Sequence, residues 1–178
     1  MLFSKEDLRK LIVPLVIEQL LAVTIGMADT MMVANVGEAA VSGISLVDSL
    51  NILLIQIFSA LATGGAVVAS QYLGRQDREN ACGAAKQLVY ACAAISILVG
   101  GLAMLGGKHL LSLIFGAVEP DVMRNAETYF WLSALSYPAL AIYNAGAALF
   151  RSMSNSRVSM MTSIAMNLVN ISGNAILI

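Results

Sequence analysis

The sequence predicts an all-α membrane protein, a polytopic bundle of about five transmembrane helices. Hydrophobic residues make up 58% of the chain, charged residues make up 12%, and the mean hydropathy is +0.80. Soluble domains carry about twice that share of charge, roughly a quarter of their residues. The apolar residues are gathered into five runs, each long enough to cross a bilayer as a helix, and short polar segments separate them.

A polar lead-in, residues 1–10, precedes the first apolar run. The five predicted spans cover approximately residues 11–36, 44–73, 81–106, 128–150 and 158–178. The fifth run is still apolar where the sequence stops, so we expect a bundle that is incomplete at its C-terminus. A complete five-span protein is the alternative.

Basic residues predict the orientation of the bundle. The lead-in, segment 74–86 and segment 151–157 together carry eight of the ten Lys and Arg residues. Because cytoplasmic loops are enriched in Lys and Arg, these three segments are expected on the cytoplasmic side. The first run lacks a cleavage site and would act as an uncleaved insertion signal. We therefore expect a multi-pass protein of the cell inner (plasma) membrane with a cytoplasmic N-terminus.

Several classes of function are disfavoured. The net charge of −1 argues against a nucleic-acid partner. Hydrolase, metalloprotease and nucleotide-binding motifs are absent, so we expect neither an enzyme nor a cofactor. Cys82 and Cys92 do not have a metal-site spacing and are expected to be small buried residues. His109 is expected to be solvated in an outer loop.

Two features of the spans predict how the helices pack. The run ATGGAVVAS in the second span contains small residues that let helices approach closely. Pro138 lies in the middle of the fourth span and is expected to kink it.

The first span, 11–36, carries acidic residues among apolar neighbours. An acid at the centre of a spanning helix costs roughly 2.5–3.5 kcal/mol on insertion scales, so it tends to face protein or water. Glu18 and Asp29 are eleven residues apart, about three helical turns, and therefore share one face with Gly26 and Thr30. This face is expected to line a site, and Glu18 and Gly26 are candidates for its cavity.

The fifth span offers matching polar groups. Asn167, Asn170 and Asn174 are spaced three and four residues apart and share a face. If the first and fifth helices are neighbours, Asp29 would meet the asparagine side chains in the outer half of the membrane. Carboxylate and amide oxygens suit a hard monovalent cation, and the acid alone can hold a proton. The asparagines could instead form interhelical hydrogen bonds that hold the helices together. For Asp48 of the second span, a helix-cap or interfacial role is at least as well supported as a functional one.

Several motifs together resemble the multidrug and toxic compound extrusion (MATE) transporters. They are ADTMMVANVG in the first span, ASQYLGRQDRENA between the second and third, Pro138, RSMSNSR after the fourth, and NLVNISGNAIL in the fifth. The resemblance runs over essentially the whole chain in the family's order. It implies two six-helix lobes, of which this chain supplies five helices of the first; the sixth helix and the C-terminal lobe would be missing partners.

The resemblance also implies a function and a site. Such proteins export cationic or amphipathic drugs in exchange for Na⁺ or H⁺ by alternating access. The family's cation site corresponds to Asp29, Asn170 and Asn174, and Tyr129 is expected to join it, while Glu18, Gly26 and Asn167 would line the substrate cavity. Some members have an acid at the position of Asn174, so the choice between Na⁺ and H⁺ stays open.

Two other functions compete with drug export. A lipid-linked oligosaccharide flippase of the same superfamily would need several cationic side chains in its cavity, and the spans hold almost none. A five-span scaffold subunit that transports nothing would need a chain that is complete at Ile178. The expected partners are otherwise a small drug-like molecule and the lipid bilayer.

Overall fold

The structure, a computed structural model, describes residues 5–34 and 37–177, except for the side chains at positions 7, 29, 33 and 173–177. All regular secondary structure in these ranges is α-helical. The five helices are α1 (Lys5–Ala34), α2 (Glu38–Gly74), α3 (Arg78–Phe115), α4 (Pro120–Ser152) and α5 (Ser156–Leu177). The prediction of an all-α bundle with five helices is confirmed.

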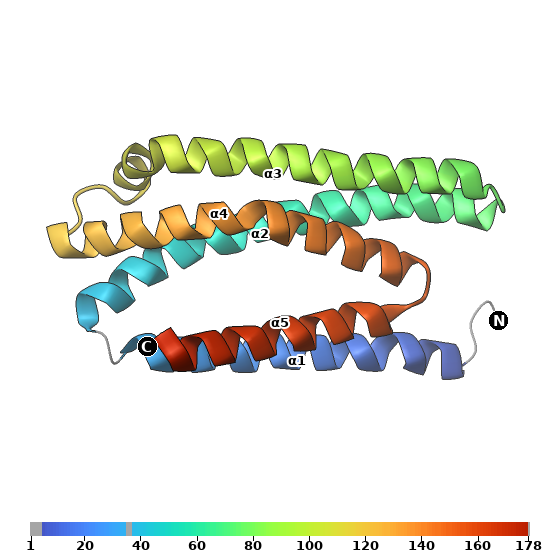
Figure 1. Ribbon diagram of the computed structural model, residues 1–178, viewed down its shortest axis with the longest axis horizontal. Coiled ribbons are helices and arrows are strands. Elements are labelled where there is room, and N and C mark those ends of the chain that lie inside the picture. The colour runs from blue at the N-terminus through green and yellow to red at the C-terminus, as the bar shows by residue number, and fades with distance from the viewer. Residues whose placement is uncertain (1–4, 35–36, 178) are drawn as a thin grey trace.

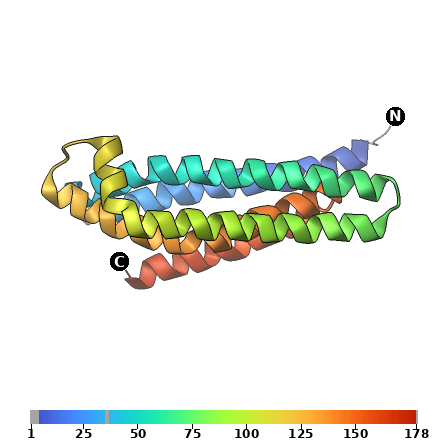
Figure 2. The same ribbon diagram turned by 90° about the horizontal axis from the view of Figure 1, so that it is seen from above.

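The helices form two groups. In Figure 1, α2, α3 and α4 lie together, and α1 and α5 lie side by side beneath them. Figure 2, seen from above, shows α2 and α3 running next to each other along the bundle. Helix α1 packs mainly against α5, and α4 packs against both α2 and α3. The sequence-based condition that the first and fifth helices be neighbours is therefore met.

The helices are longer than the predicted spans. Helix α3 continues to Phe115 and α4 begins at Pro120, so the connection expected over 107–127 is reduced to 116–119. Hydropathy marks where an apolar run ends, whereas a helix can continue into polar sequence. Among the described residues, three helices are long and apolar enough to cross a membrane, namely α1, α2 and α3.

Small side chains let α2, α3 and α4 pack closely. Ala62, Ala66 and Ala69 of the predicted small-residue run are at most 3% exposed, which confirms that this run packs against neighbouring helices. The largest fully buried side chains include Phe58 of α2 and Tyr137 of α4. Their rings pack edge to face, with centroids 6.2 Å apart, a favoured arrangement for aromatic pairs.

Pro138 lies inside α4, and Figure 1 shows that helix bending near its middle, so that its second half slopes towards α1 and α5. Proline cannot donate the hydrogen bond that the carbonyl four residues earlier would accept. That carbonyl belongs to Ala134, and Gly100 of α3 approaches it so closely that a Cβ at Gly100 would lie 2.9 Å from the oxygen. The expected kink is thus present, and it lies at a tight α3–α4 contact.

The connection between α2 and α3 ends in a residue that caps the N-terminus of α3. The Asn80 side chain donates a 2.7 Å hydrogen bond to Asp77, and the Asn80 backbone N–H donates one of 3.1 Å. These two bonds, with nearby Arg75, lower the pKa of the Asp77 carboxyl below its ordinary value. Asp77 is therefore the N-cap of α3.

Candidate functional site

The polar groups of the bundle fall into two clusters, and the first surrounds Glu18 of α1. Its carboxylate accepts hydrogen bonds from the Tyr143 hydroxyl of α4 at 3.1 Å and the Ser159 hydroxyl of α5 at 2.8 Å. Arg151, at the end of α4, lies 3.7 Å from the same carboxylate and donates to Ser159 at 3.3 Å. The Glu18 and Arg151 side chains are 16% and 28% exposed. Three helices thus meet at one largely buried ion pair.

The contacts of Glu18 in this cluster indicate a different role from the one predicted for it. Glu18 was expected to line a substrate cavity, and the structure places it against an arginine and two hydroxyl groups. Its charge is therefore paired, as is usual for an acid within a spanning helix.

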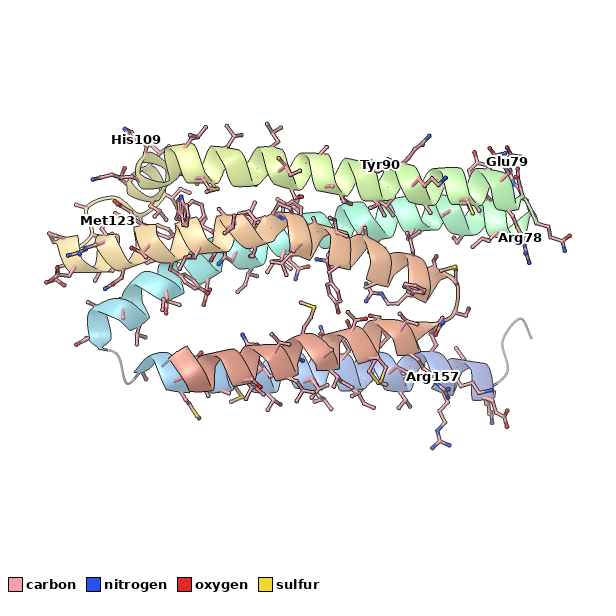
Figure 3. All side chains as sticks on the ribbon, viewed as in Figure 1. Arg78, Glu79, Tyr90, His109, Met123 and Arg157 are labelled. Carbon is pink, nitrogen blue, oxygen red and sulfur yellow. The ribbon has the colours of Figure 1, made fainter. Side chains whose placement is uncertain are left out.

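Figure 3 shows that the helix ends carrying Arg78, Glu79 and Arg157 lie at one end of the bundle, with His109 and Met123 at the other.

The second cluster lies between α2 and α4. The Tyr129 hydroxyl donates a 2.9 Å hydrogen bond to the Asp48 carboxylate. Three residues along α2, Asn51 accepts from Tyr137 at 2.8 Å and donates to Ser133 at 3.2 Å. These groups border a cavity of about 320 Å³. Among the residues with described side chains, no cationic group forms an ion pair with Asp48.

Tyr129 was expected at a cation site with Asp29, and the structure joins it to Asp48 on α2. The cap role considered for Asp48 is not what its position shows, because the residue lies inside α2, which begins at Glu38. Spacing alone could not separate these roles, because they depend on which helices are neighbours.

The remaining residues of the predicted cation site lie on α1 and α5. The side chains of Asp29 and Asn174 lie outside the described residues. Asn170 is exposed, and Asn167 is partly buried. The amide nitrogen of Asn167 is inaccessible to solvent and has no hydrogen-bond partner in the described part of the chain. The cation site stays a prediction.

Gly26 borders a shallow apolar hollow along α1, about 490 Å³ in volume. Its neighbours there include Met27, Thr30 and Met31, and the Thr30 hydroxyl donates to the Gly26 carbonyl within the helix at 2.8 Å. A Cβ at Gly26 would meet nothing within 4 Å in the described structure. Close helix packing therefore does not explain the glycine.

Other expectations are resolved more simply. Cys92 is fully buried as expected, but Cys82 is exposed, so the prediction of two buried cysteines is wrong for Cys82; both thiols are free. His109 is exposed, although it lies on α3 and not in a loop. Among the described residues, no group of three or more His, Cys, Asp or Glu side chains could hold a metal ion.

Sequence reasoning missed six residues that complete the two clusters. They are Asn51, Ser133, Tyr137, Tyr143, Arg151 and Ser159. A signal for part of the set was present, since Tyr129, Ser133, Ser136 and Tyr143 follow one another at intervals of four, three and seven residues and mark one polar face of α4. Nothing in the spacing indicates which helix that face meets.

The structure thus defines a helical membrane protein that holds ionisable groups between its helices. The sequence model of the MatE family matches residues 14–176, and the chain belongs to this family. It is similar to the uncharacterized transporter YisQ of Bacillus subtilis (strain 168), with 28% identity over 167 residues. The match covers 93% of this chain and 36% of YisQ, so the chain spans about a third of that relative's length. No solved structure matches significantly.

Proposed function

We propose that the complete protein exports cationic or amphipathic organic compounds in exchange for Na⁺ or H⁺ by alternating access. The five helices would form most of the first lobe, and the sixth helix and second lobe would complete the transport path. Membership of the MatE family supports this proposal. The observation that supports it most is the register of α1 against α5, that is, which positions of the two helices lie at the same level.

The register follows from one hydrogen bond. Helices α1 and α5 run in parallel in Figure 1, and the Ser159 hydroxyl donates to Glu18. Because both helices rise by the same distance per residue, position 29 of α1 is expected level with position 170 of α5, eleven residues further along each. Eleven residues are also about three turns, so both positions return to the faces that carry Glu18 and Ser159.

This repetition supports a cation site built from Asp29, Asn170 and Asn174. An oxygen-rich site between two packed helices would suit Na⁺, and a lone carboxylate would suit a proton. In the proposed mechanism, the ion or proton enters from outside and neutralises the Asp29 carboxylate. The bound organic cation then loses its counter-charge, and α1 repacks as the outward cavity closes.

The distribution of basic residues supports a cytoplasmic N-terminus in the plasma membrane. Segments 75–78 and 151–157 lie at the same end of the bundle as the start of α1. Arg151 is paired with Glu18, and no basic side chain forms an ion pair with Asp48 among the residues whose side chains are described. An anionic glycolipid substrate is therefore less well matched than an organic cation.

Reconstituted transport tests the proposal. The complete protein in proteoliposomes, loaded with a fluorescent cationic dye, would be given an imposed Na⁺ gradient or pH gradient. We expect dye to move against its own gradient under one of these two conditions. Dye movement that responds to neither ion gradient would contradict coupled export.

A further inference from the structure

We propose that the cavity beside Asp48, between α2 and α4, binds the ammonium group of a small organic cation. This inference rests on the proposed function and adds a substrate-binding site to it. The cavity has a volume of about 320 Å³. This is near the lower end of the range for ligand pockets, about 300–1,000 Å³, and favours a compact cation.

The chemistry of the lining favours a cation. Asp48 supplies a carboxylate inside a membrane-spanning helix, and no cationic side chain among the described residues forms an ion pair with it. An acid at such a position normally has a partner of opposite charge. The Tyr129 hydroxyl fixes one carboxylate oxygen, Oδ1, at 2.9 Å. A positively charged guest would supply the missing charge.

Aromatic and apolar groups favour an organic cation over a metal ion. Tyr129 and Tyr137 both line the cavity, together with Ile52, Ile55 and Leu140. The Tyr137 hydroxyl is held by Asn51 at 2.8 Å, which fixes the orientation of its ring. Aromatic rings attract alkylammonium groups, and aliphatic walls accommodate their methylenes. A hydrated Na⁺ would gain nothing from these walls.

The position of the cavity suits a transport path. Along α4, the residues that form one face are Tyr129, Ser133, Ser136, Leu140 and Tyr143. The first four line the cavity, and Tyr143 contacts Glu18 of α1. The cavity and the Glu18 cluster therefore lie along one face of α4, so a guest bound between α2 and α4 would lie on the face of α4 that also contacts α1.

Equilibrium binding of radiolabelled tetraethylammonium to the purified complete protein tests this inference. Asp48→Asn keeps the size of the side chain and an acceptor for Tyr129 but removes the charge. We expect it to weaken binding by roughly tenfold or more, the equivalent of about 1.4 kcal/mol. The matched control is Asp121→Asn, which removes an exposed acid in the first turn of α4 and should leave binding unchanged.

A second variant tests the location without altering the charge. Ser136→Trp would fill the cavity from its exposed edge and should also abolish binding, because Ser136 is a lining residue whose side chain is accessible. Equal affinity in the unsubstituted protein and Asp48→Asn, or unaltered binding in Ser136→Trp, would overturn the inference. So would an unsubstituted protein that moves the dye in proteoliposomes but binds no tetraethylammonium. In that last case the proposed export function would stand.

Discussion

Arg151 Nη1 of α4 lies 3.7 Å from Glu18 Oε1 of α1, and this ion pair joins the two groups of helices. Ser159 of α5 completes the junction through hydrogen bonds to both residues. Figure 1 shows α4 diverging from the α1–α5 pair away from this junction, whereas α2 approaches α1 at the other end of the bundle. The ion pair therefore marks the end at which α4 is attached to the α1–α5 pair.

Replacing Arg151 tests the energetic importance of this junction. Arg151→Met leaves the Glu18 carboxylate without its cation, and we expect a loss of about 1–3 kcal/mol of stability, less than for a fully buried pair. Arg157→Met, which alters an exposed arginine in α5, should change stability by about 0.5 kcal/mol or less. Thermal unfolding of the complete protein in detergent measures both.

The same measurement on a double variant separates the ion pair from other effects of Arg151. Glu18→Gln combined with Arg151→Met should cost less than the sum of the single changes, because no unpaired charge remains. Strictly additive costs would show that the two side chains are not coupled.

Adjacent glycines in α3 provide a test of the close α3–α4 contact. A Cβ at Gly100 would lie 2.9 Å from the Ala134 carbonyl oxygen, whereas one at Gly101 would meet nothing within 4 Å. Gly100→Ala should destabilise the protein by about 1–3 kcal/mol through overpacking. Gly101→Ala should stabilise it by about 0.5–1 kcal/mol, since alanine is the better helix former. Comparable unfolding midpoints for the two variants would contradict this packing.

The α3 cap predicts a pH dependence. The Asn80 hydrogen bonds lower the folded-state pKa of Asp77 below its unfolded-state value. The contribution of the cap is therefore complete above the unfolded-state pKa and is lost as pH falls through the lower folded-state pKa. Hydrogen exchange at the Asn80 amide should accelerate, beyond its intrinsic pH dependence, as the pH falls through this acidic range. An Asp77→Asn cap, which does not titrate, should lack this additional acceleration.

The sequence predicted the number and order of the helices because each apolar run is long and short polar segments separate the runs. It also predicted the small-residue packing of α2 and the kink at Pro138, which depend on local composition. Helix ends were less predictable, because Lys108 and His109 are compatible with a helix that continues beyond the apolar run.

The polar clusters could not be predicted from the sequence, for a different reason. Tyr129 and Tyr143 share one face of α4, but the first contacts α2 and the second contacts α1. That difference arises from the bend of α4 and the crossing of the helices. Helical periodicity predicted which residues of α1 and of α5 share a face, but it could not show that Arg151 reaches Glu18.

The most direct test of the proposed coupling is Asp29→Asn in the complete protein. Labelled cationic dye efflux would be measured with an imposed Na⁺ gradient and, separately, with an imposed pH gradient, with Asp121→Asn as the matched control. The proposed mechanism predicts that Asp29→Asn abolishes the ion-dependent part of efflux and that the control retains it. Efflux that is unchanged and still ion-dependent in Asp29→Asn would contradict the mechanism.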